Sequence, residues 1–286
     1  MLVGIAHPTS VMQNQEYIRL DYWQVAVAAS LVVISGAISL ALRLGLERRL
    51  LVASVRTVVQ LLLIGLVLRW IFLQGRQWYV VLALLAAMTL IAGIAAARRV
   101  EWRYQGMWLD SIVSIWASSW LMAAVAVFGV VQIQGGDGHS SWYNPRYTIP
   151  LLSMILGNTL SGISLGLDRL GSELASKRDQ VETLLALGAT RWEAAQPAIR
   201  QSIRTAMIPT INTMMVVGLV SLPGMMTGQI LAGMDPEDAA KYQIVIMFLI
   251  AAGAALGTVG VALLGYRRLF TADHQFLPGR LVKNGA

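Results

Sequence analysis

The residues best suited to a specific chemistry lie in one polar segment, Asp168 to Thr210, and the chemistry that they suit is docking to another protein. This segment of 43 residues carries 11 of the 37 full charges of the chain. Apolar residues recur at helical spacing before Gly188, a residue type typical of the left-handed cap that ends a helix. Thr190 and Glu193 then have the spacing of a capping box, which satisfies the first backbone donors of a new helix. The segment therefore predicts a helix, a tight turn and a second helix.

Two side chains at the start of the second predicted helix suit a protein interface. Arg191 and Trp192 follow the turn directly. Arginine and tryptophan are among the residue types that most often anchor interfaces, and a rigid turn would present both to a partner. The residues leave an alternative open, which is an amphipathic hairpin lying on the membrane surface.

A second group of polar residues interrupts segments that are otherwise apolar. Arg56 and Gln60 lie one helical turn apart and could line a polar path, although the long side chain of Arg56 could equally reach the membrane surface. The Pro223-Gly224 pair lies 12 residues beyond Ile211, or about 18 Å along a helix. Proline there frees a backbone carbonyl, which a membrane tolerates only where protein buries it or a cavity hydrates it. The sequence predicts either a broken helix beside a path or a packing kink.

The predicted translocation path combines polar, helix-breaking and methionine positions from several apolar segments. Its members are Arg56, Gln60, Asn158, Asn212, Pro223, Gly224, Met225, Met226 and Gln229. Methionine thioethers suit copper(I) better than iron and more often fill irregular cores, so metal ligands stay unassigned. The chain has no Cys, and its three His residues lie outside the apolar segments. These facts exclude disulfides, thiolate sites and a histidine-built metal or haem site within the membrane.

Long apolar segments must position these residues. Only 13% of the 286 residues are charged, about half the fraction usual in a soluble domain, so a soluble enzyme is excluded. The sequence predicts an all-α polytopic membrane protein with about seven transmembrane helices and one long helical cytoplasmic loop, 168–210. The predicted spans are Trp23 to Leu42, Leu51 to Phe72, Trp78 to Ala97, Ser111 to Ile133, Ile149 to Leu167, Ile211 to Leu231 and Ile244 to Tyr266.

Positive charge sets the expected orientation. The connections on one side would hold 16 Lys and Arg residues against 5 on the other, so the basic side is cytoplasmic, the N-terminus outside and the C-terminus inside. We expect an outside tail at 1–21, a single transmembrane domain at 22–267 and a cytoplasmic tail at 268–286. The positive-inside rule already explains the net charge of +7, so we expect no binding of nucleic acid.

Several stretches resemble a known family of transporters. Glu182 to Ala189 is similar to the EAA-type loop of ABC transporter permeases, in which a Glu lies six residues before a Gly and a short helix docks into a groove on the ATPase subunit. More specifically, the chain resembles the bacterial Fet-type iron-export permeases and their plant aluminium-tolerance relatives, the UPF0014 family, from about Arg56 to Arg268. The stretches that carry this second resemblance are Ile208 to Gly233, Ser54 to Leu61 and Gly157 to Thr159.

The resemblance implies a permease subunit in the bacterial inner membrane that pairs with a separate ATPase and moves its substrate outward. It also implies a permease homodimer. No lysine of the chain stands in the Gly-Lys-Ser/Thr context of a phosphate-binding loop. We therefore expect this chain to bind no cofactor, with ATP and Mg bound by the partner ATPase. The implied ATPase-coupling residues are Glu182, Leu187, Gly188, Ala189, Thr190, Arg191 and Trp192.

Two pairs of glycines predict close helix packing. Gly162 and Gly166, and likewise Gly253 and Gly257, have the small-xxx-small spacing that lets helices approach closely. The spacing leaves open whether they pack helices within one protomer or between two protomers.

Three questions of function stay open at this point. The substrate could be a metal cation, iron by the resemblance, or a sugar nucleotide or other small metabolite, since Arg56 suits an anion better than a cation. The chain could instead be a secondary transporter without an ATPase, but none of its 15 Asp and Glu residues lies deep in the predicted spans. It could also be a membrane-anchored interaction protein, with a dry interior around Asn158 and Pro223.

Overall fold

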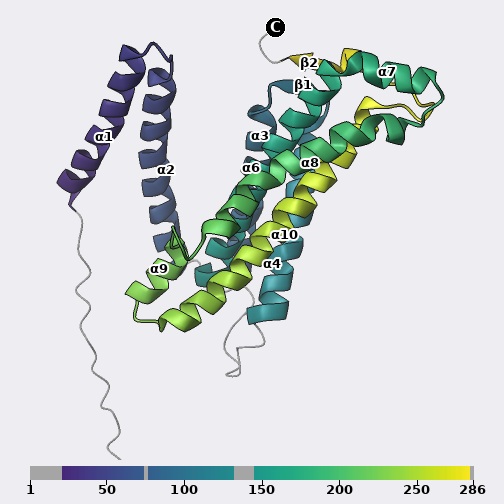
Figure 1. The fold of residues 1–286 in the computed structure, drawn as a ribbon. Helices are drawn as coiled ribbons and strands as arrows, with labels where there is room; N and C mark the ends of the chain where they lie inside the picture. The colour runs from purple at the N-terminus through teal and green to yellow at the C-terminus, as the bar shows by residue number, and fades with distance from the viewer. Residues whose placement is uncertain (1–20, 74–76, 132–144, 284–286) are drawn as a thin grey trace, which may run out of the picture. The chain divides into compact units, whose positions relative to one another are not determined.

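The protein is a multi-pass membrane protein, and the predicted all-α fold class is confirmed. The computed structural model describes residues 21–73, 77–131 and 145–283 (Figure 1). Of the predicted outside tail, all but Asp21 lies outside these residues. Within the described ranges, six helices are long and apolar enough to cross a membrane. They are α1 (Tyr22–Ala41), α2 (Glu47–Leu73), α3 (Trp78–Arg98), α4 (Met107–Ala124), α6 (Pro145–Ser176) and α10 (Pro236–Leu269).

The chain divides into two compact units, residues 1–70 and 71–286. In the first unit, Ser39 organises the turn between α1 and α2. Its Oγ accepts the backbone N–H of Leu46 at 3.0 Å and donates to the Glu47 carboxylate at 3.1 Å. Apolar side chains of both helices are exposed along most of their length, which suits helices surrounded by lipid.

The segment expected to form a single span from Ile211 to Leu231 is divided between two helices of the second unit. α8 (Arg191–Val216) runs from the polar segment straight into the apolar one, a turn follows, and α9 (Gly224–Leu231) begins at the predicted break. The sequence rules place the start at Thr190 correctly. Pro197 and Pro209 are residues at which a helix often ends or kinks, but α8 continues through both of them to Val216. The two helices that we expected to be separate are therefore one.

The long loop expected at 168–210 is correspondingly reduced. α6 extends to Ser176, and α7 (Arg178–Ala186) follows after a single residue, Lys177. The connection between the two long helices α6 and α8 therefore consists of α7 and the turn at Leu187–Thr190. The predicted hairpin is present, although most of its second arm belongs to a transmembrane helix.

α6, α8 and α10 pack through small residues, and their contacts fix the direction of the chain. Ser202 of α8 donates to the Gly166 carbonyl of α6 at 2.6 Å. A Cβ on Gly257 of α10 would lie 2.6 Å from Thr159 Cγ2. Both glycine pairs thus serve contacts within this chain.

The same contacts show how the chain returns across the membrane. Gly162 approaches Ala206 while Gly166 bonds to Ser202, so α8 runs opposite to α6. Residues of α10 follow those of α6 in the same order, so these two helices run parallel. α8 and α9 together therefore bring the chain back between α6 and α10, which gives a seventh, broken crossing.

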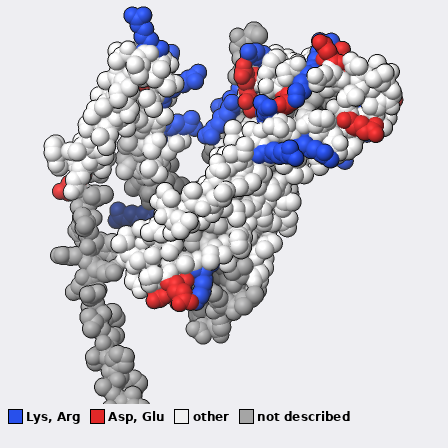
Figure 2. All heavy atoms as spheres, viewed as in Figure 1, with Lys and Arg blue, Asp and Glu red and all other residues white. Residues whose placement is uncertain are grey.

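One end of the second unit carries most of its charge and a small antiparallel sheet. β1 (Trp102–Tyr104) follows α3, and β2 (Leu281–Lys283) follows the short helix η2 (Pro278–Arg280) near the C-terminus. Figure 2 shows most blue and red atoms of this unit gathered at the end that carries α7 and the strands, then a long uncharged surface, and a smaller charged cluster at the opposite end. The positive-inside rule predicts that the end with α7 and the strands faces the cytoplasm.

Gly257 provides a test of the packing between α6 and α10. Gly257→Ala would place a methyl group 2.6 Å from Thr159 and 2.9 Å from Ser118, so we expect it to lower the free energy of unfolding by about 1–3 kcal/mol. Thermal unfolding in mild detergent, followed by tryptophan fluorescence, measures the change. The control is Gly157→Ala, because nothing lies within 4 Å of a Cβ at that position. A variant of Gly257 as stable as the control would contradict the packing.

Candidate coupling site and translocation path

The turn between α7 and α8 is rigidly built and presents an apolar side chain. Gly188 has φ of +93°, a left-handed conformation that L side chains rarely adopt. The Thr190 hydroxyl accepts the N–H of Glu193 at 3.3 Å, and the Glu193 carboxylate accepts the N–H of Thr190 at 2.7 Å. The predicted capping box is therefore present. Leu187, directly before the glycine, is 80% exposed, an unusual exposure for a leucine at a tight, well-ordered turn.

Hydrogen bonds with Thr190 lower the pKa of Glu193. The larger effect comes from the backbone N–H and the smaller from the hydroxyl. Because the pKa is lowered on folding, the charged form contributes to stability above the ordinary pKa of a glutamate, and this contribution is lost as the pH falls through the lowered value. The box is therefore intact at neutral pH.

Arg191 is fastened to the C-terminal tail. Its backbone N–H donates to His274 Nδ1 at 2.9 Å, and its Nη1 donates to the Thr271 carbonyl at 3.1 Å. Its guanidinium also lies 5.9 Å from the ring centre of Tyr266, against which Trp192 packs edge to face at 5.6 Å. Sequence reasoning assigned both residues to a partner, whereas the structure uses Arg191 to hold the turn against α10. Of these two residues, only Trp192, which is 42% exposed, can both hold the turn against α10 and contact a partner.

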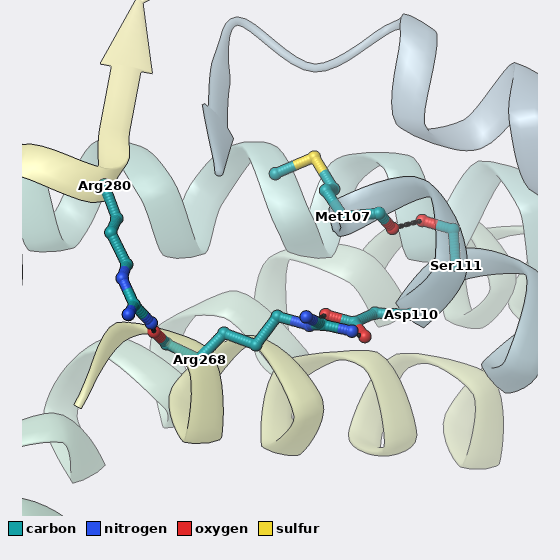
Figure 3. A network of polar contacts seen from close by, with 5 residues as sticks. All are labelled: Met107, Asp110, Ser111, Arg268 and Arg280. Atoms are coloured by element: carbon teal, nitrogen blue, oxygen red, sulfur yellow. Dashed lines mark hydrogen bonds and ion pairs between the residues drawn. The ribbon is translucent and has the colours of Figure 1, made fainter. Parts of the chain in front are cut away.

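A charged clamp secures the start of the same tail. Arg268, near the end of α10, reaches across to the buried Asp110 of α4, with its Nε 2.7 and 2.8 Å from the two carboxylate oxygens (Figure 3). Arg280 donates to the Arg268 carbonyl at 3.0 Å. Gly106 has φ of +87°, a left-handed conformation that favours glycine, and a Cβ there would lie 2.6 Å from Nη1 of Arg268, so a larger residue would displace the guanidinium. Burial and the charge of Asp110 raise the pKa of the neighbouring Tyr104, which stays neutral.

The break between α8 and α9 lies well inside the membrane segment. Met225, in the first turn of α9, packs against an apolar core cluster to which α10 contributes Ile246, Leu249 and Ile250. These residues lie 10 to 14 positions beyond the start of α10 at Pro236, or about 15–20 Å of helix. The helix is therefore broken beside the Pro223-Gly224 pair, and the residue after the break packs against an apolar core, as expected for a position within the membrane.

The residues of the predicted path have different surroundings. Asn158 is exposed on α6 and donates to the Met154 carbonyl at 2.9 Å, and Asn212 is exposed on α8. Pro223 and Met226 are half-buried, as is Gln229, although its Oε1 is buried without a hydrogen-bond partner. Arg56 and Gln60 are exposed on α2, in the first unit. The structure thus brings the α9 residues together with α10, and leaves the two asparagines on open helix faces.

Gln243 is a buried polar residue that sequence reasoning missed. It lies on α10, is 4% exposed, and neither of its amide atoms has a partner among the described residues. Sequence reasoning did not consider it because it lies one residue before the predicted span that begins at Ile244. Among the residues that the structure describes, no three His, Asp or Glu side chains gather as a metal site.

Comparison with known proteins gives a consistent result. Residues 22–270 match the family described as "Uncharacterised protein family (UPF0014)". The UPF0014 membrane protein slr1647 of Synechocystis is 42% identical to this chain, covering 82% of it and 88% of the relative. The probable iron export permease protein FetB of Escherichia coli is 33% identical over 90% of this chain and 95% of its own length. The protein ALUMINUM SENSITIVE 3 of Arabidopsis thaliana is 30% identical over 87% and 88%. No solved structure matches.

Breaking the ion pair of Asp110 should lower the free energy of unfolding more than breaking an exposed ion pair. Asp110→Asn leaves Arg268 without its counter-charge, and we expect it to lower the free energy of unfolding by about 1–3 kcal/mol, less than for a fully buried pair because Arg268 is partly exposed. The control is Glu237→Gln, which breaks an exposed pair with Lys241 and should cost less than about 0.5 kcal/mol. Thermal unfolding of both variants in detergent tests this. Equal losses of stability would show that the clamp is an ordinary surface pair.

Proposed function

Because this chain belongs to the UPF0014 family of membrane proteins, we propose that it is the permease subunit of an ATP-driven exporter, with a separate ATPase docked on α7 and the turn after it. A relative named as a permease supports a transport subunit rather than an enzyme. One relative bears the name of a probable iron export permease, which makes iron the leading substrate. A sugar nucleotide or other small metabolite is the alternative substrate.

The observation that carries the proposal is the exposed leucine on a rigid turn. Leu187 is 80% exposed at the charged, cytoplasmic end, between a left-handed glycine and the end of α7. An amphipathic hairpin lying on the membrane would bury such a side chain in lipid. Here the start of α8 is instead held against α10 and the C-terminal tail by Arg191 and Trp192. A partner groove would bury Leu187 as an anchor.

α8 supplies a route from the turn to the interior of the membrane. It is a single helix of 26 residues, about 39 Å long, with the capping box at one end and the break before α9 at the other. A displacement of the turn by a closing ATPase would therefore be transmitted along α8 to the break. The polar and broken positions around the break, Asn212, Pro223, Gly224 and Gln229, would form part of the path.

The buried carboxylates argue against a secondary transporter. Asp110 and Glu173 are both buried, but both lie toward the cytoplasmic ends of their helices and are paired with cations, Asp110 with Arg268 and Glu173 with Arg169 and Lys177. Proton or sodium coupling commonly uses carboxylates deep within the membrane. An ATPase that binds ATP and Mg on a separate chain supplies the energy in this account. We further propose a permease homodimer, on the strength of the family resemblance.

Co-purification with the ATPase tests the proposal. Full-length tagged chain, extracted in mild detergent, should retain an ATP-hydrolysing subunit, and vesicles holding the pair should move iron only with ATP. Leu187→Ser should reduce retention of this subunit by about tenfold or more, because interface anchors contribute over about 2 kcal/mol. The variant should keep the stability of the wild type, since Leu187 makes few contacts within the chain.

The matched control is Val282→Ser, which removes an exposed apolar side chain from β2 at the same end of the second unit. It should leave the ATPase bound. If Leu187→Ser retains the ATPase as well as the control does, docking on the turn is wrong. If the wild type transports its substrate without any ATPase, the exporter proposal fails as a whole.

A further inference from the structure

A basic groove separates α6 from α8 at the cytoplasmic end. Its volume is about 520 Å³, and it is lined by Arg169, Glu173, Lys177, Gln196, Pro197, Arg200, Gln201 and Arg204. The register of the two helices is fixed nearby by the hydrogen bond from Ser202 to the Gly166 carbonyl. The groove is therefore a built feature of the helix pair, with four cationic side chains and one carboxylate.

Two of the four cations in the groove are uncommitted. Glu173 is buried and pairs with both Arg169 and Lys177. Arg200 and Arg204, by contrast, make no hydrogen bond or ion pair with any residue that the structure describes. They lie one turn apart on α8, so their guanidinium groups share one face of the helix. Two adjacent guanidinium groups form a site suited to phosphate oxygens.

The groove lies at the level where the apolar part of both helices begins. No charged residue occurs between Arg146 and Asp168 of α6, or from Arg204 to Asp235 across α8 and α9. One turn deeper than the cations, the same open faces carry Leu165 on α6 and Ile208 on α8, which are 40% and 52% exposed. A ligand with an anionic head and an apolar tail matches this change from charged to apolar surface.

We propose that this groove binds the phosphate of an anionic phospholipid from the cytoplasmic leaflet. The headgroup phosphate lies between Arg200 and Arg204, the amides of Gln196 and Gln201 donate to its remaining oxygens, and the acyl chains follow Leu165 and Ile208. A free phosphate would use the same cations but would gain nothing from the apolar surface. The site is independent of ATPase docking, because it does not involve Leu187.

Native mass spectrometry of the purified full-length chain tests the site. With equal amounts of phosphatidylglycerol and phosphatidylcholine, the wild type should retain the anionic lipid at least about tenfold more strongly, and the difference should shrink as salt is raised. The double variant Arg200→Gln, Arg204→Gln should lose about 25-fold in binding of phosphatidylglycerol, since each cation contributes about fivefold. The control Arg98→Gln, Arg99→Gln removes two exposed arginines from the cytoplasmic end of α3, outside the groove, and should bind as the wild type does.

Three outcomes would overturn the proposal. They are equal retention of the two lipids by the wild type, equal losses in the two double variants, and protection against heat by millimolar inorganic phosphate equal to that by phosphatidylglycerol. The last outcome would assign the groove to a free anion. If the double variant does not fold, the single variant Arg200→Gln and the comparison of two lipids on the wild type decide the question.

Discussion

The continuity of α8 is the constraint on which the rest of the structure depends. Within a membrane each helix must satisfy its own backbone hydrogen bonds, so a helix can be broken only where protein or a hydrated cavity takes over. Here the chain is helical from the capping box at Thr190 to Val216, and the break falls between Val216 and Gly224. One continuous helix, α8, thus connects the cytoplasmic turn to the break between Val216 and Gly224.

Two features keep α8 in place, and they act at different depths. Within the membrane, glycine and serine bring α8 and α10 against α6 at close range, as the Ser202 to Gly166 hydrogen bond shows. At the cytoplasmic end, the C-terminal tail holds Arg191 through His274 and Thr271, and is itself held by the pairing of Arg268 with Asp110. A turn fastened in this way can pass on a force, whereas a loose loop would absorb it.

Local signals predicted the parts of this arrangement that local physics determines. The glycine cap at Gly188, the capping box at Thr190 and the break at Pro223-Gly224 depend on a few neighbouring residues, and all three are present. Sequence patterns could not show that the helix starting at Arg191 continues through the membrane, because its charged residues, Arg200 and Arg204, interrupt the apolar periodicity. Sequence patterns also could not predict contacts between residues far apart in the chain. The attachment of Arg191 to His274 and of Arg268 to Asp110 depends on tertiary packing alone.

The most direct measurement of the central claim is photocrosslinking from the turn in intact membranes. A photoreactive amino acid placed at position 187 should form a crosslink to the ATPase subunit, and the same amino acid at position 282 should not, because only the first position lies on the proposed docking surface. Crosslinking from position 187 to lipid alone, while the ATPase is present and active, would contradict the account and make the hairpin a membrane-surface element.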